Sequence, residues 1–498
     1  MAGRDENPFT APLEPGGAPR DGGGAGGPDV RDRPDAAREL PASFGLATST
    51  FVVVASMVGT GVLTTSGFTV FFVGSNAWML ALWVVGAVIA ACGALTLAEL
   101  AAAIPRSGGD YVFLYEAYGP LAAFLSGWVS FLIGFGAPIA ASAFAAGEYL
   151  LRPFDLDGPT GLLARRGLAT ALILLFGHIH GRSRSGSVNV QGVSTVLKFG
   201  LLAALAVAGL AAGWGRWENL ADAPPVDSID RPLLLAALSS LVYVYYAYTG
   251  WNGAAYLAGE VADPRRTMPR AIFVGTGLVV VLYLAMNTFY ALALTPGDLR
   301  GVVARAEEAG DPDPLNALTP IAEIASARLF GARVASGLSI VIGLTLLASL
   351  SAFILTGPRV AYAMAGAGQF PAIAGRLSGP SRTPTAATAM QIAWSLVLLW
   401  TGSFEGIVVY AGVGLALFSM LTISAVYALR IRRPDLPRPF RTPGYPVVPA
   451  VYLASTLALT VATCLERRGA ALASLASIAL GVPFYYGWRW SSNRRAGR

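Results

Sequence analysis

Charged residues are scarce in this 498-residue chain. Asp, Glu, Lys and Arg make up 13% of it, whereas hydrophobic residues make up 54%. A soluble domain carries about 25% charged residues, so the composition excludes an ordinary soluble protein and indicates one that crosses a membrane several times. There are only two cysteines, Cys92 inside an apolar run and Cys464 near the end of another. This number argues against a disulfide framework and against a cysteine metal site.

Large apolar residues are nearly absent from the start of the chain. Residues 1–42 are rich in Gly, Pro, Asp and Arg, and such a segment cannot bury enough surface to fold. It also lacks the positively charged start and adjacent apolar core of a signal peptide. We therefore expect a disordered cytoplasmic tail at 1–42, a transporter-sized membrane domain at 43–490 and a short cytoplasmic tail at 491–498.

Long apolar runs fill most of the remaining sequence. Because about 20 mainly apolar residues cross the hydrocarbon core, we expect an all-α protein with about twelve transmembrane helices. They are expected at 45–72, 76–103, 120–150, 167–181, 191–213, 233–258, 269–294, 333–366, 385–402, 405–430, 446–465 and 470–488. Arginines gather in alternate loops, most densely after the tenth span, which favours cytoplasmic termini. Arg165, Arg166, Arg467 and Arg468 run against this bias.

Glycines interrupt two of these spans. The first span reads Ser56-Met57-Val58-Gly59-Thr60-Gly61-Val62, and the sixth reads Tyr245-Tyr246-Ala247-Tyr248-Thr249-Gly250-Trp251-Asn252. Glycine weakens a helix by about 1 kcal/mol relative to alanine, and a backbone group freed in hydrocarbon needs a partner inside the protein or a cavity. Paired breaks that open each of two five-span halves indicate the binding site of a secondary transporter. The alternative is that these small residues only allow close helix packing.

The breaks offer the groups that a zwitterion needs. Free N–H groups near Thr60 and Gly61 would attract a carboxylate, and the helix dipole adds to this attraction. Carbonyl groups near Met57 and Val58 would suit an ammonium group, and the sixth span can repeat this with the carbonyls of Tyr246 and Thr249.

Several motifs resemble those of the amino acid–polyamine–organocation superfamily. Gly59-Thr60-Gly61-Val62 is similar to its Gly-Ser-Gly-Ile break, and residues 99–111 are similar to its loop after the second span. Residues 248–266 resemble the sixth span and following loop of the L-type amino acid transporter branch, and residues 358–371 resemble the end of its eighth span. The resemblance covers roughly residues 43–490. It implies a LeuT-type 5+5 inverted repeat with broken helices 1 and 6, two further C-terminal helices, and amino acid transport across the plasma membrane by alternating access.

The resemblance also implies roles for individual residues. Thr60 and Gly61 would bind the substrate carboxylate, the carbonyls of Met57, Tyr246 and Thr249 would bind its ammonium group, and the Tyr246 ring would be a gate. The family often has glycine where Thr249 stands, and a β-branched residue there narrows the site. The complete predicted substrate site comprises Met57, Val58, Gly59, Thr60, Gly61, Tyr246, Thr249, Gly250 and Asn252.

Lys198 is a charged residue inside the fifth span. It matches the position where sodium-independent members of the superfamily carry a lysine in place of a sodium ion, and its ammonium group would reach carbonyls near Ser56 and Gly59. Transport would then be independent of sodium, and reversible deprotonation of Lys198 could couple it to protons. The alternative is that Lys198 snorkels to the cytoplasmic interface.

Other ionisable residues lie near the ends of the expected spans. We expect Glu99 and Glu260 to form gates or helix-end ion pairs with loop arginines. His178 and His180 face different sides of a helix, which argues for interfacial residues rather than a metal pair. Glu148 and Glu405 are expected to be solvated.

Acidic residues are missing from the middles of the third, sixth, eighth and tenth spans. A cationic substrate would need an acidic partner there, because an unpaired charge in a desolvated site is costly. We therefore expect a carrier of neutral amino acids. No span brings a nucleophile together with a base, so we do not expect an enzyme, and we expect no cofactor, metal or nucleic acid. The alternatives are a carrier of cationic amino acids or polyamines, and an amino acid sensor with a transporter fold.

The sequence leaves exchange and proton-coupled uptake as two open modes of transport. Eukaryotic members of the L-type branch pair with a single-span glycoprotein through a cysteine in an outer loop. We find no such cysteine, and therefore expect no covalently linked accessory subunit.

Overall fold

The computed structural model describes residues 44–106, 108–154, 156, 158–182, 187–211, 215–220, 233–378 and 383–496. Within these ranges, the side chains of 187–195, 257 and 489–496 are not described. The tail expected at 1–42 lies outside the described residues. At the other end, helix α18 (Arg468–Ala496) continues into the segment that we expected to be a C-terminal tail.

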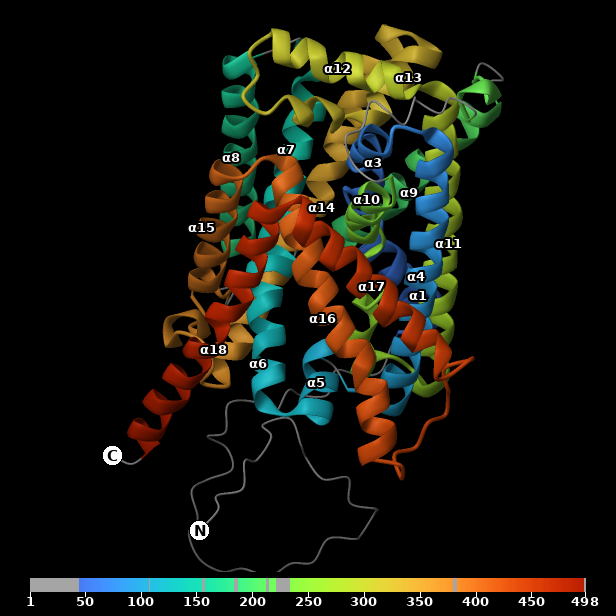
Figure 1. Ribbon diagram of the computed structural model, residues 1–498. Coiled ribbons are helices and arrows are strands. Elements are labelled where there is room, and N and C mark those ends of the chain that lie inside the picture. The colour runs from blue at the N-terminus through green and yellow to red at the C-terminus, as the bar shows by residue number, and fades with distance from the viewer. Residues whose placement is uncertain are drawn as a thin grey trace, which may run out of the picture.

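The described residues contain nine helical segments that are long and apolar enough to cross a membrane and three shorter apolar ones (Figure 1). These match the twelve expected spans in order, so the prediction of an all-α polytopic membrane protein is confirmed. The segments are α1 (Leu46–Met57) with α2 (Gly61–Thr64) and α3 (Ser66–Val73), α4 (Asn76–Ala103), α6 (Pro120–Val129) with α7 (Gly136–Leu151), α8 (Gly158–Arg182), α9 (Ser187–Ala211), α10 (Leu233–Tyr248), α11 (Pro264–Ala293), α14 (Ala332–Gly366), α15 (Thr385–Thr401), α16 (Phe404–Arg432), α17 (Val447–Glu466) and α18.

Three further helices lie at the two ends of this bundle. Helix α5 (Asp110–Tyr118) is at one end, and helices α12 (Pro296–Glu308) and α13 (Ile321–Phe330) are at the opposite end (Figure 1). Thr295 and Asp298 form a capping box that starts α12, and it satisfies two backbone N–H groups that have no acceptor within the helix. We refer to these two ends of the molecule as the α5 end and the α12 end.

The third span contains a π-helical turn, η2 (Ser130–Phe135), between α6 and α7. Such a turn disturbs the regular α-helical hydrogen bonds. Two side chains of α15 donate to carbonyls inside the turn. Gln391 Nε2 lies 2.9 Å from the Phe131 oxygen and Trp394 Nε1 lies 2.8 Å from the Leu132 oxygen. The ninth span therefore fixes the irregular turn of the third.

The fourth span is longer than expected, because α8 begins at Gly158 rather than near residue 167. The added turns carry Arg165 and Arg166, whose charges are paired. Arg165 Nε lies 3.2 Å from Glu148 Oε2, and the Arg165 and Arg166 side chains also pair with Asp311 and Asp313. Glu148 is buried, so the prediction that it is solvated was wrong.

Glu405, at the start of α16, is also paired rather than solvated. Its Oε1 lies 3.2 Å from Arg467 Nε, and it accepts a hydrogen bond from the Tyr243 hydroxyl. Arg467 in turn lies over the Phe72 ring, 3.8 Å from its centroid. Three of the four arginines that run against the charge bias are thus neutralised by acidic side chains.

Candidate functional site

The first span is broken where the sequence predicted. Helix α1 ends at Met57 and helix α2 begins at Gly61. Because Thr65, between α2 and α3, also has α-helical backbone angles, residues 61–73 form one nearly continuous helix. The N–H groups of Gly61 and Val62 lie in its first turn, where no intrahelical acceptor exists. Binding of a substrate carboxylate at this helix start, near Thr60 and Gly61, stays a prediction.

The two broken spans cross at their glycines. A Cβ atom on Gly61 would overlap the Cα atom of Ala247 in α10, and one on Gly250 would overlap the carbonyl oxygen of Ser56. Gly250 also has a φ of 107°, which side chains rarely adopt. Close helix packing, the alternative explanation of the glycines, is therefore real, and it brings the two breaks together.

The predicted gate residue lies beside the first break. The Tyr246 hydroxyl is 3.4 Å from Thr60 Oγ1, and both side chains are buried. This contact joins the end of α10 to the start of α2. The gating role of Tyr246 and the substrate roles of Thr60 and Gly61 stay predictions.

Two carbonyls expected to bind the ammonium group already have donors. The Met57 oxygen accepts from the Gly59 N–H at 2.8 Å and from the Tyr283 hydroxyl at 2.8 Å. The Tyr246 oxygen accepts from the N–H of Thr249 at 3.2 Å and from its hydroxyl at 2.7 Å. In this conformation a substrate ammonium group would have to replace one donor at each oxygen. The prediction missed Tyr283, which lies far away in sequence on α11.

The side-chain amide nitrogen of Asn252 already has an acceptor in this conformation. Its Nδ2 atom donates to Asp110 Oδ2 at 2.8 Å. This bond joins the chain after the sixth-span break to the first residue of α5. Val58, Gly59, Thr249 and Gly250 lie at the two breaks as predicted, whereas the Asn252 side chain is bound to the loop after the second span.

Lys198 is buried, with 4% of its surface exposed, so it does not snorkel to the interface. Its Nζ donates to Ser349 Oγ of α14 at 2.6 Å. The eighth span therefore supplies the partner, and the hydrogen bonds of the described residues include none from Lys198 to Ser56 or Gly59. The expected contact with the first span is not present in this conformation.

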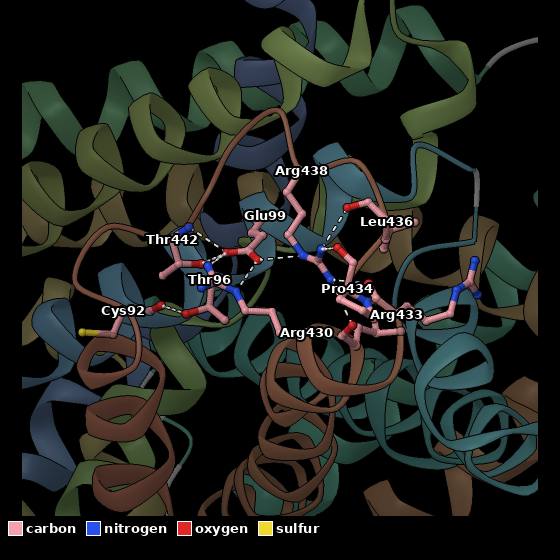
Figure 2. Close-up of polar contacts among 10 residues, drawn as sticks. Cys92, Thr96, Glu99, Arg430, Arg433, Pro434, Leu436, Arg438 and Thr442 are labelled. Atoms are coloured by element: carbon pink, nitrogen blue, oxygen red, sulfur yellow. Dashed lines mark hydrogen bonds and ion pairs between the residues drawn. The ribbon is translucent and has the colours of Figure 1, made fainter.

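Glu99, near the end of α4, forms the helix-end ion pair that the sequence predicted (Figure 2). Its carboxylate receives Arg430 Nε at 2.9 Å and Nη2 at 2.7 Å. The backbone N–H and the hydroxyl of Thr442 each donate to it at 2.7 Å, and Arg438 lies 3.6 Å away. The Arg430 guanidinium also covers the Tyr445 ring. This cluster ties α4 and α16 to the 433–446 loop.

The other ionisable candidates behave differently. Within the described residues Glu260 has no arginine in ion-pair distance, and its predicted role in a gate stays a prediction. His178 pairs with Arg182 at 3.0 Å, whereas His180 Nε2 contacts Ser351 Oγ at 2.8 Å. In the part of the chain that the structure describes, no group of His, Cys, Asp and Glu side chains could hold a metal ion.

The sequence matches a protein-family model and several known proteins. The model of the family described as "Amino acid permease" matches residues 44–485. The Large neutral amino acids transporter small subunit 2 of Oryctolagus cuniculus is 27% identical over 93% of this chain and 84% of its own length. The Serine/threonine exchanger SteT of Bacillus subtilis is 28% identical over 90% of this chain and 97% of its own. The Asc-type amino acid transporter 1 of Mus musculus is 26% identical over 91% and 82%.

Proposed function

Because the chain belongs to the amino acid permease family, we propose that it carries neutral amino acids across the plasma membrane by alternating access, without sodium. Two relatives are named for large neutral amino acids and for serine and threonine, which supports this substrate class. The observation that carries the proposal is the crossing of the two helix breaks at Gly61 and Gly250.

In the proposed site, the substrate carboxylate binds the N–H groups at Thr60 and Gly61. Its ammonium group takes the place of the Thr249 hydroxyl at the Tyr246 carbonyl, a bond of 2.7 Å that a side-chain rotation would release. The Tyr246 ring then closes over the substrate, and its contact with Thr60 supports a gate at this position. A neutral side chain suits a site without a carboxylate in the middle of the spans.

Lys198 serves in this proposal as a fixed positive charge in place of a sodium ion. The bond from its ammonium group to Ser349 supports this role, because it anchors the charge to the eighth span. No carboxylate of the described residues lies in ion-pair distance of Lys198, so its charge is available to nearby carbonyl oxygens when the first span moves.

We further propose that the α5 end faces the cytoplasm and that the carrier needs no covalently linked subunit. The arginines of the 433–446 loop support the orientation. Cys92 and Cys464 are both only partly exposed and lie on or near membrane spans, which supports a carrier that is not cross-linked to a partner.

Uptake of labelled alanine by proteoliposomes tests the proposal. Replacing sodium by choline should leave uptake unchanged, and leucine or serine should compete with alanine better than arginine or putrescine. Preloading with unlabelled alanine, compared with an imposed pH gradient, separates exchange from proton-coupled uptake. An absolute sodium requirement, or arginine as the best competitor, contradicts the proposal. Saturable binding without flux favours a sensor.

A further inference from the structure

Asp110 is an acidic residue at the contact between α5 and the inner part of the sixth span. Its Oδ2 atom accepts from Asn252 Nδ2 at 2.8 Å and from the Tyr256 hydroxyl at 3.3 Å. Tyr256 belongs to η6 (Gly253–Glu260), the short helix that follows the sixth-span break. The Gly108 N–H also donates to the backbone carbonyl oxygen of Tyr256 at 3.4 Å. Asp110 therefore holds η6 against the loop after the second span.

The groups around Asp110 are neutral. Tyr256 faces it from η6 and Tyr245 interacts with it electrostatically from α10, while α16 contributes the Thr422 hydroxyl. Arg106, the nearest arginine along the chain, is paired with Glu116 instead. Within the described residues no cation lies in ion-pair distance of Asp110. Asp110 is only partly exposed, and a carboxylate that loses part of its water without gaining a cation favours its neutral, protonated form.

We propose that Asp110 is a proton-binding site, which holds the α5 end closed when it is occupied and gives its proton to water when η6 moves away. Protonation adds one proton to a carboxylate oxygen, and Asn252 and Tyr256 still have an oxygen to which they can donate. When η6 leaves, the carboxyl group becomes hydrated and releases the proton. Only the assignment of that water to the cytoplasm depends on the proposed transport function.

The direction of the effect follows from linkage. Burial raises the pKa of Asp110 from 3.8 to about 6, although hydrogen bonds from Asn252 and Tyr256 oppose the shift. Because the pKa is higher in the closed arrangement than in water, protonation stabilises the closed arrangement. That stabilisation is complete below about pH 4 and is lost as the pH rises through about 6. Above that pH the charged carboxylate favours opening.

Hydrogen exchange at the contact between η6 and the loop before α5 tests the site in the full-length protein without requiring transport. The Gly108 amide donates across this contact to the backbone oxygen of Tyr256, so a peptide that contains Gly108 reports opening. The exchange rate of the wild type is divided by that of Asp110→Asn at each pH, which removes the intrinsic pH dependence. We expect this ratio to rise by about tenfold to a hundredfold between pH 4.5 and 7.5.

Two further variants make the test specific. Tyr256→Phe removes a donor that stabilises the charged form, so the transition should move to higher pH. Asp435→Asn changes an exposed aspartate at the same end of the molecule and should behave as the wild type. A ratio that does not change with pH overturns the proposal. If Asp110→Asn does not fold, the exchange rates of the same peptide in the wild type and in Tyr256→Phe are each divided by the rate of a distant peptide in Asp435→Asn at the same pH. The proposal is overturned if the wild type and Tyr256→Phe then show their transitions at the same pH. Failure of amino acid transport in liposomes, with the exchange result intact, would contradict only the proposed function.

Discussion

At the first helix break, Gly59 and Gly61 differ in the space around them. A Cβ atom on Gly59 would have only the Met57 oxygen within 4 Å, at 3.9 Å, whereas one on Gly61 would overlap the Ala247 backbone. Gly61→Ala should therefore force the broken spans apart and cost about 1–3 kcal/mol of stability, as overpacking does. Transport per folded molecule should be lost in Gly61→Ala, and Gly59→Ala, which changes the same predicted site without a steric clash, should lose less. Thermal unfolding in detergent and uptake by proteoliposomes measure both effects. Equal behaviour of the two variants would show that the crossing does not position the site.

Tyr246 allows ring and hydroxyl to be tested separately. Its hydroxyl makes one long contact, 3.4 Å to Thr60, so Tyr246→Phe should change the apparent affinity little. Tyr246→Ala removes the ring that we expect to cover the substrate, and loss of about 1.5–3 kcal/mol of apolar burial corresponds to about tenfold or more in affinity. Competition uptake measures the apparent affinity of each variant. A similar affinity in Phe and Ala variants would argue against a gating ring.

The sequence predicted which residues lie at the two helix breaks, but not which distant side chains contact them. Glycine interruptions are local, and they located both breaks. The occupancy of the Met57 carbonyl depends on Tyr283, which is 226 residues away, and the position of the Asn252 side chain depends on Asp110, 142 residues away. No local pattern specifies which of many tyrosines or aspartates meets a given atom after folding.

At the scale of helices, the Glu99 cluster joins α4, α16 and the 433–446 loop. Glu99 is buried, and its carboxylate accepts from Arg430 and Thr442. Glu99→Gln would leave two arginines without their counter-charge, and breaking a buried ion pair on one side costs about 3–5 kcal/mol. We expect a clearly lower melting temperature than for Glu307→Gln, an exposed control on α12. An equal melting temperature for both variants would mean that solvent already screens the pair.

The helices themselves were largely predictable, because a lipid-facing surface must be apolar along its whole length. The fourth span was placed too short for a physical reason. The expected span began after Arg165 and Arg166, because charged residues are costly in a membrane helix. Their pairing with Glu148, Asp311 and Asp313 lets the helix include them. Helices α5, α12 and α13 were not predicted, since they are short and do not cross the membrane.

For the whole molecule, the testable quantity is the orientation in the membrane. We expect the α12 end to face outward. In a background without Cys92 and Cys464, Glu307→Cys should react with a membrane-impermeant maleimide on intact cells. Asp435→Cys, in the loop after α16, should react only after the cells are opened. Both positions are exposed, so access to the protein surface does not limit either reaction. The reverse pattern would invert the proposed orientation.

The arginines of α8 are synthesised well before some of their acidic partners. Ribosomes add about 5–20 residues per second, and Asp311 follows Arg165 by 146 positions, so roughly 7–30 s separate the appearance of the two partners. During that interval Glu148 is available to Arg165, whereas Arg166 has to wait for Asp313. If insertion follows the order of synthesis, the fourth helix enters the membrane while the charge of Arg166 still lacks Asp313. Its final position depends on a segment that the cell has not yet made.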